Sequence, residues 1–137
     1  MSGIEEPVGL ARFLGIQVVE AGPGRAVCRL EILPHHLMSG GSVHAGTMVA
    51  LADSACGYGC RATLPAGLAF TTVELKANFV GNVRAGTLVC HASLVHAGRA
   101  TQVWDATVMP EGSEQPLALF RCTQVTVGRS DQQAPVA

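Results

Sequence analysis

This chain has few aromatic and few charged residues. Phe, Trp and Tyr make up 4% of its 137 residues, and Asp, Glu, Lys and Arg make up 14%. The nine Lys and Arg residues do not cluster and the formal net charge is −1, so we expect no nucleic-acid partner. The uncharged run 62–73 contains Pro65 and is too short to cross a bilayer, so we expect no membrane segment.

The chain also lacks a secretory signal and an even set of cysteines. Residues 1–6 have neither the basic start nor the apolar centre of a signal peptide. Five scattered cysteines in such a chain predict reduced thiols and a cytoplasmic protein. Cys56 and Cys60 are one helical turn apart, but no second pair stands at zinc-site spacing. We therefore expect buried thiols and no metal.

Apolar residues are plentiful, at 48% of the chain. A chain of this length forms one domain, and this composition supplies a full core with apolar surface left to bury in an oligomer. We expect a single domain over 1–137, with its core at about 10–127. The polar residues 128–137 are expected to form a flexible tail.

One long helical stretch interrupts a series of predicted strands. A helix capped by Ser42 is expected over 43–64, and Gly57 and Gly59 in it indicate close packing against its backbone. A short helix is expected over 7–14. Strands are expected over 15–21, 25–33, 70–79, 87–97, 100–109 and 117–127. Short turns between them predict antiparallel pairing, and hence an α+β fold of about six strands wrapped around one helix.

Two details of this prediction bear on the site. Strict alternation in 70–79 places Thr71, Val73, Leu75, Ala77 and Phe79 on one face of the strand, and Thr72, Glu74, Lys76 and Asn78 on the other. His35 and His36 are expected to be exposed loop residues. Trp104 is expected in the core or at an interface.

Asp53 is the only charged residue between His44 and Arg61. No cation lies three or four residues away on the helix, and an unpaired buried carboxylate is costly. Two interpretations remain open. Asp53 either faces water or a hydroxyl such as that of Ser54, or it is a catalytic carboxylate.

Four segments together carry a family resemblance. The first has two parts, Gly41-Ser42-Val43-His44-Ala45-Gly46 and Leu51-Ala52-Asp53-Ser54-Ala55. The second is residues 72–79, the third is Gly86-Thr87-Leu88, and the fourth is His96-Ala97-Gly98-Arg99. In this order and spacing they resemble the hotdog-fold acyl-CoA thioesterases of the phenylacetate-pathway and 4-hydroxybenzoyl-CoA type. The resemblance covers about residues 10–127.

The resemblance implies a hotdog fold, a homodimer that often forms a homotetramer, and hydrolysis of an acyl-CoA substrate without a cofactor. Asp53 would be the nucleophile or the general base on water, with Ser54 as a hydroxyl beside it. The Ala45 N–H, next to Gly46, would polarise the thioester carbonyl, and His44 would shape that pocket. The motif departs from the family at Ala45, where glycine is usual.

Further positions are implied for substrate binding. Lys76, Arg84 and Arg99 match positions where some relatives bind coenzyme A phosphates, and Asn78 and Gly98 lie in the same motifs. Met38 and Gly57 stand where some relatives carry polar side chains, so water positioning differs here. The implied substrate-binding set is Met38, Gly57, Asn78, Lys76, Arg84, Gly98 and Arg99.

Helix geometry adds an expectation from the residues themselves. Asp53 is nine residues past His44, which is about 13 Å along a helix and on its opposite side. The two ends can serve one carbonyl only if two antiparallel helices lie side by side across a two-fold axis, so catalysis requires a dimer. A non-catalytic acyl-CoA binding protein and an acyl-CoA hydratase or dehydratase remain alternatives. The acyl group is expected to be small or medium-sized, aryl groups included.

Overall fold

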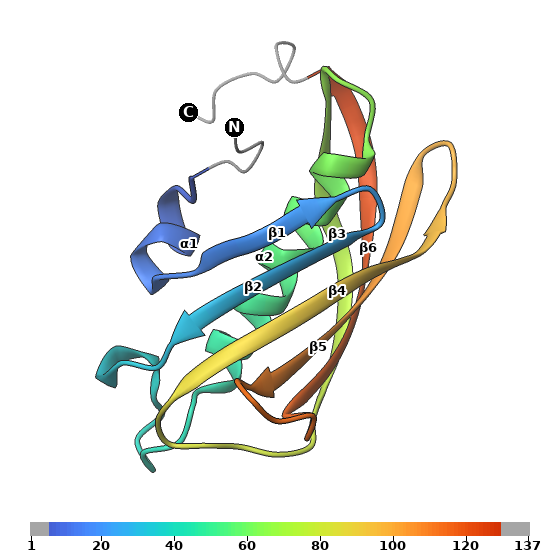
Figure 1. Cartoon of the computed structure of the whole chain (residues 1–137). Coiled ribbons are helices and arrows are strands. Elements are labelled where there is room, and N and C mark those ends of the chain that lie inside the picture. Colours follow the sequence, from blue (N-terminus) through green and yellow to red (C-terminus); the bar gives the residue numbers. More distant parts are fainter. Residues whose placement is uncertain (1–5, 130–137) are drawn as a thin grey trace.

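A computed structural model describes residues 6–129 as one long helix enclosed by a curved sheet. Figure 1 shows α2 inside the curve, with β1, β2 and β4 crossing in front of it. The elements are α1 (Gly9–Leu14), β1 (Gln17–Gly22), β2 (Arg25–Glu31), the 3₁₀ turn η1 (Pro34–His36), α2 (Ala45–Thr63), β3 (Leu68–Phe79), β4 (Thr87–Ala97), β5 (Thr101–Pro110) and β6 (Ala118–Arg129).

The six strands form one antiparallel sheet in the order β1-β2-β4-β5-β6-β3. The helix α2 connects β2 to β3, which lies at the far edge of the sheet from β1. The predicted six-stranded antiparallel sheet wrapped around one helix is therefore confirmed. Strands β1 and β3 each have one edge without a partner strand.

The core lies between α2 and the inner face of the sheet. Burial along α2 repeats in pairs every four residues, because one face of the helix rests on the strands. The buried helix positions are Thr47, Met48, Leu51, Ala52, Ala55, Cys56, Gly59 and Cys60. Trp104 of β5 is fully buried against this face, as predicted for a core residue.

Gly59 allows the closest approach between α2 and the sheet. A Cβ atom at this position would lie 2.5 Å from Cη2 of Trp104. At Gly57 the nearest atom to such a Cβ is Cζ of Phe70, at 3.4 Å, which is ordinary contact. The expected close packing is confirmed at Gly59.

All five cysteines are buried and carry free thiols. Burial raises the pKa of the Cys28 thiol to about 12 and that of Cys60 to about 11, so these side chains stay protonated. No helix in the part of the chain that the structure describes has the length and apolar character needed to cross a membrane.

Most element boundaries differ from the prediction by one or two residues, and two of the differences have a clear cause. The helix begins at Ala45 with His44 as its N-cap, not at 43 with Ser42 as the cap, because the Ser42 carbonyl accepts from Met38 N–H in a loop turn. Strand β6 continues to Arg129, two residues beyond the expected end, since it stays paired with β3. The rest of the expected flexible tail, 130–137, lies outside the described residues.

His36 is fully buried, so the prediction that it is exposed was wrong. Its Nδ1 accepts from Leu33 N–H at 2.9 Å, and its Nε2 lies 2.7 Å from the Leu14 carbonyl oxygen. These partners require a neutral ring protonated at Nε2. His36 therefore joins the end of α1 to the segment that follows β2.

The predicted alternation of β3 was wrong at Thr72. The register with β6 shifts between Thr72 and Glu74, so Val73 is an extra residue in the strand. Thr72 consequently faces Gln124 on the inner side of the sheet, with Leu75, Ala77 and Phe79. An unbroken strand would have turned the Thr72 hydroxyl outward.

We predict that Gly59→Ala destabilises the protein. The added methyl group forces Trp104 to move, and the overpacking exceeds the gain in helix propensity, for a net loss of about 1 to 2 kcal/mol. Denaturant unfolding measures the loss. Gly57→Ala is the matched control and should be at least as stable as the wild type. Equal stability of the Gly59→Ala variant and the wild type would contradict the close approach.

We predict that His36 makes stability depend on pH. Burial and the nearby His35 lower the pKa of His36 below its ordinary value, so the unfolded chain takes up a proton before the folded chain does. The stabilisation is complete above about pH 6.5 and is lost as the pH falls below it. Melting temperatures between pH 7.5 and 5 measure this effect.

His36→Asn keeps an acceptor near Leu33 N–H but does not titrate, so its melting temperature should fall less steeply over the same range. The exposed His91 supplies the control, because His91→Asn should follow the wild-type slope. Parallel curves for the wild type and His36→Asn would rule out this role.

Candidate active site

The face of α2 that the sheet leaves uncovered carries the predicted catalytic residues. Ala45 and Gly46 are exposed, and Asp53, Ser54 and Gly57 are half-buried, as are Val49 and Ala50 between them, whereas the buried helix positions face the core. The family motif therefore lies along one stripe of the helix. Most side chains on this stripe are small, so a second surface can approach the helix closely.

Asp53 is held by a hydroxyl group from the edge strand. Thr72 Oγ1 donates to Asp53 Oδ1 at 2.8 Å, so Thr72 and not Ser54 is the hydroxyl partner. No hydrogen bond from residues 6–129 reaches the other carboxylate oxygen. The carboxylate borders a cavity of 240 Å³ lined by Glu6, Val8, Asp53, Ser54, Gly57, Tyr58, Arg61, Phe70 and Thr72. One oxygen is thus fixed, and the other is available for chemistry.

The amino-terminal end of α2 presents one free backbone donor. His44 Nδ1 accepts from Gly46 N–H at 2.7 Å, and Thr47 N–H donates to the His44 carbonyl. Within the described part of the chain, Ala45 N–H donates no hydrogen bond. The first N–H groups of a helix carry partial positive charge, so Ala45 N–H is suited to bind a developing oxyanion.

Side chains far away in the sequence hold this helix start in place. Asn82 Oδ1 accepts from Val43 N–H and Asn82 Nδ2 donates to the Val43 carbonyl, both at 3.1 Å. The His36 carbonyl accepts from His44 N–H and from the Thr47 hydroxyl. Arg84 Nη2 donates to the Gly40 carbonyl at 2.9 Å. The loop before α2 is therefore fixed by its neighbours.

One chain does not bring the two catalytic groups together. Helix α2 is continuous from Ala45 to Thr63, and Asp53 follows Ala45 by eight residues. The two positions are therefore separated by about 12 Å along the helix axis. A single thioester carbonyl cannot contact both within one chain.

The residues predicted to bind substrate lie in four places. Gly57 borders the Asp53 cavity, while Met38 and Arg84 lie at the loop before α2. Lys76 and Asn78 face the outer side of the sheet in a shallow depression that they share with Asp105 and Arg121.

Gly98 and Arg99 form the turn after β4, while Arg84 precedes this 11-residue strand. They are therefore about 35 Å from Arg84 at the opposite end of the strand. One coenzyme A molecule on one chain cannot reach all three predicted cations.

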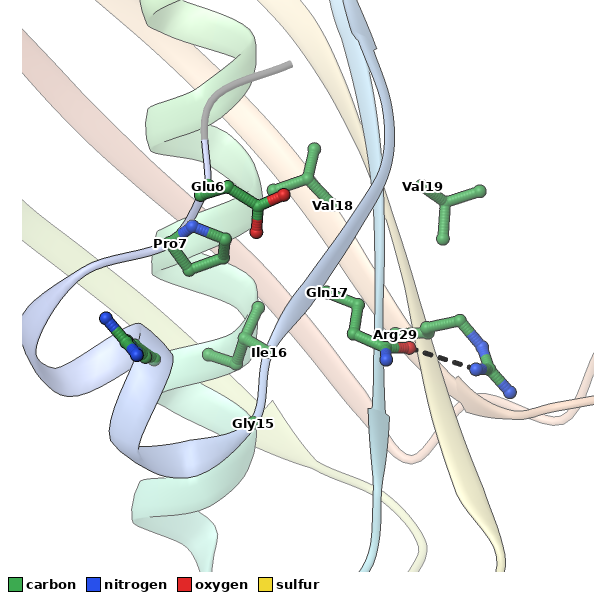
Figure 2. A pocket seen from close by; sticks show the side chains of 9 residues that line it. Glu6, Pro7, Gly15, Ile16, Gln17, Val18, Val19 and Arg29 are labelled. Atoms are coloured by element: carbon green, nitrogen blue, oxygen red, sulfur yellow. Dashed lines mark hydrogen bonds between the residues drawn. The ribbon is translucent and has the colours of Figure 1, made fainter. Parts of the chain in front are cut away.

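A larger cavity than that at Asp53 lies elsewhere, between α1 and β1. It measures 710 Å³, and Figure 2 shows Glu6, Pro7 and Ile16 on one side and Arg29 bonded to Gln17 on the other. Arg29 also pairs with Glu111 at 3.1 Å. The charged side chains that line this cavity are those of Glu6, Arg12 and Arg29, and none of the predicted catalytic residues lines it.

No group of three or more His, Cys, Asp or Glu side chains between residues 6 and 129 is arranged to hold a metal ion. The polar groups that the uncovered side of α2 and its neighbours offer for chemistry are the Asp53 carboxylate, the Thr72 hydroxyl and the Ala45 N–H.

Sequence reasoning missed Thr72, Gln124 and Asn82. Thr72 and Gln124 reach the site only through the bulge and the pairing of β3 with β6, which no local pattern indicates. Asn82 follows Gly81 in what reads as a turn. The signal that could have found Asn82 is its ability to mimic a backbone segment with its amide.

Comparisons with known proteins show the family of this chain. The model of the thioesterase superfamily matches residues 40–117. The 1,4-dihydroxy-2-naphthoyl-CoA hydrolase of Listeria monocytogenes is 31% identical over 116 residues, which cover 85% of this chain and 94% of that protein. The acyl-coenzyme A thioesterase PaaI of Escherichia coli is 30% identical over 120 residues, with 86% and 82% covered.

A comparison with solved structures supports the fold. The structure of the conserved protein PA5202 from Pseudomonas aeruginosa matches with a TM-score of 0.84 and 27% identity, and the match covers 88% of this chain and 95% of that one. The matched family region contains both the start of α2 and Asp53. The chain is a hotdog-fold thioester hydrolase and belongs to the thioesterase superfamily.

Proposed function

We propose that this protein hydrolyses small or medium acyl-CoA thioesters, including aryl ones, at sites shared between two copies of the chain. The observation that carries the proposal is the uncovered stripe of α2, which presents an oxyanion donor at Ala45 and a carboxylate at Asp53. Relatives that act on acyl-CoA thioesters support the substrate class. The aromatic rings of Tyr58 and Phe70 beside Asp53 support an aryl acyl group.

The hydrolysis needs a polarised carbonyl and an activated nucleophile. In one route, a water oxygen adds to the thioester carbon and its proton passes to Asp53, while the carbonyl oxygen becomes an oxyanion beside Ala45 N–H. The oxyanion then reforms the carbonyl, the C–S bond breaks, and the coenzyme A thiolate takes the proton from Asp53. In the other route, the carboxylate itself adds to the carbonyl carbon and the C–S bond breaks, which releases the coenzyme A thiolate and leaves an anhydride. Water then hydrolyses the anhydride to the free acid and the Asp53 carboxylate, and the proton from water passes to the thiolate.

A homodimer would bring the two groups together. If the α2 helices of two copies lie antiparallel, Asp53 of one faces Ala45 of the other, and small side chains on this stripe favour close approach. The edge strand β3 supports such a dimer, because Leu75 and Phe79 on its inner face are 41% and 45% exposed. Pairing β3 with its copy would bury both side chains and satisfy the open edge.

Several finer points belong to the same proposal. Arg84 of one copy and Arg99 of another are candidates for the coenzyme A phosphates, and a homotetramer would follow from pairing two dimers. No cofactor is needed, because both chemical groups come from the protein. The five free thiols support a cytoplasmic location, where cysteines remain reduced.

We predict that Asp53→Asn abolishes most thiol release from acyl-CoAs. The amide keeps a hydrogen bond with Thr72 but cannot accept a proton or attack, so kcat should fall by about 10² to 10⁴-fold. Aryl, short and medium acyl-CoAs form the substrate panel. Glu74→Gln, which neutralises an exposed carboxylate on the outer face of β3, should retain wild-type rates.

Full activity of Asp53→Asn would contradict the mechanism. Absence of thiol release by the wild type together with tight acyl-CoA binding would instead identify a binding protein.

We predict that Ala45→Pro lowers kcat by about 10² to 10³-fold, because it removes the N–H that binds the oxyanion. Proline suits the first position of a helix, and the extended conformation of His44 suits a residue before proline. The helix should therefore survive. Ala45→Gly keeps the N–H and serves as the control.

Co-expression of Ala45→Pro with Asp53→Asn tests whether the site is shared. A purified mixed dimer would hold one site with both groups intact and one with neither, so it should regain about half of the wild-type activity. A mixed dimer as inactive as either parent would mean that each site lies within one chain.

A further inference from the structure

We propose that Thr72, oriented by Gln124, is the residue that positions the Asp53 carboxylate for catalysis. This inference rests on the proposed function, since it concerns how the proposed base or nucleophile is held. Thr72 Oγ1 lies 2.8 Å from Asp53 Oδ1 and 2.9 Å from Gln124 Oε1. The three side chains come from β3, α2 and β6, so they form one chain of hydrogen bonds across three elements.

The single hydroxyl proton of Thr72 fixes the direction of this chain. An ionised carboxylate only accepts hydrogen bonds, so Thr72 must donate to Asp53. Gln124 must then donate its NH₂ group to Thr72, which requires the amide rotated so that its nitrogen and oxygen exchange places. The amide oxygen then lies at the position 3.5 Å from Cys122 Sγ, where the thiol can donate to it. Asp53, Thr72 and the Gln124 amide then each have a hydrogen-bond partner of the right kind.

The burial of Gln124 has no other explanation in the described fold. Gln124 is 1% exposed and continues an apolar row of β6 that contains Ala118, Phe120 and Cys122. Burying an amide costs free energy unless it is hydrogen-bonded. Its partners are Thr72 and Cys122, so the buried amide serves to orient the Thr72 hydroxyl.

The bulge in β3 supports the same role. The extra residue Val73 turns Thr72 inward, toward Asp53, and β-bulges often re-aim a side chain beside an active site. A strand without the bulge would pair as well with β6 but would leave Asp53 without a donor. The interruption in the pairing of β3 with β6 is thus explained by the contact between Thr72 and Asp53 that it creates.

The positioned carboxylate keeps one oxygen for chemistry. Thr72 binds Oδ1, and the rotation of the carboxyl group is restricted by this bond. Asp53 also borders the cavity, so the second oxygen is the one left for chemistry there. A base or nucleophile held in one orientation reacts faster than one that rotates freely.

Steady-state kinetics of Thr72→Val and Thr72→Ser test the role. Thr72→Val has nearly the same shape but no hydroxyl, so kcat should fall by about 10- to 100-fold while KM stays within about two-fold. Thr72→Ser should recover kcat to within about three-fold of the wild type. Thr71→Val, which alters the neighbouring outward-facing residue, is the matched control and should behave as the wild type.

Gln124→Met gives an independent test if Thr72→Val folds poorly. It leaves the Thr72 hydroxyl in place but removes its donor, so kcat should fall by a smaller factor, again at unchanged KM. In an Asp53→Asn background, Thr72→Val should cause no further loss, because the two residues act as one unit.

These experiments distinguish a failure of the positioning role from a failure of the proposal on which it rests. Wild-type kcat for Thr72→Val, or a loss confined to KM, would overturn the positioning role while leaving hydrolysis by Asp53 intact. If Asp53→Asn itself keeps full activity, the proposed mechanism fails as well, and if the wild type releases no thiol the proposed function fails. If Thr72→Ser is as slow as Thr72→Val although both fold, the hydroxyl is not the group that matters.

Discussion

The hydrogen bond from the Thr72 hydroxyl to the Asp53 carboxylate is the contact on which the site depends. Asp53 has no cation three or four residues away on the helix, and it borders a cavity lined by both polar and apolar side chains. A carboxylate in such a place needs a donor to remain in a fixed orientation. The edge strand supplies that donor, so the sheet and the helix are joined by a polar contact at the point where chemistry occurs.

Almost every backbone N–H and carbonyl group around the start of α2 has a hydrogen-bond partner. His44 occupies Gly46 N–H, Asn82 pairs with both backbone groups of Val43, and the buried His36 receives two donors from the helix start on its carbonyl. Within the described residues, this arrangement provides no acceptor for Ala45 N–H. The methyl group of Ala45, where relatives have glycine, does not disturb it because the residue is helical.

The same helix that carries both groups also keeps them apart. Its rigidity fixes Ala45 and Asp53 on one stripe but separates them by two turns, so a second copy is the simplest way to complete a site. Glycine at 57 and 59 divides the helix into two environments. On the core side, the absence of a side chain at Gly59 leaves room for the Trp104 ring. On the opposite side, the absence of a side chain at Gly57 keeps the helix surface flat beside the Asp53 cavity.

Much of this protein follows from the sequence alone. The order of the elements, the long helix, the antiparallel strands and the choice of Asp53 come from periodicity, turn residues and one misplaced charge, all of which are local signals. The tertiary structure decided the rest. The helix cap moved from Ser42 to His44 because the loop folds on itself, and His36 is buried because α1 packs over it.

The bulge that turns Thr72 inward depends on how β3 meets β6, about 50 residues further along the chain. Contacts of this range are set by strand pairing, which leaves no trace in the alternation of a single strand. The acid could therefore be found by reading the chain in order, whereas the groups that hold it could be found only after the chain had folded.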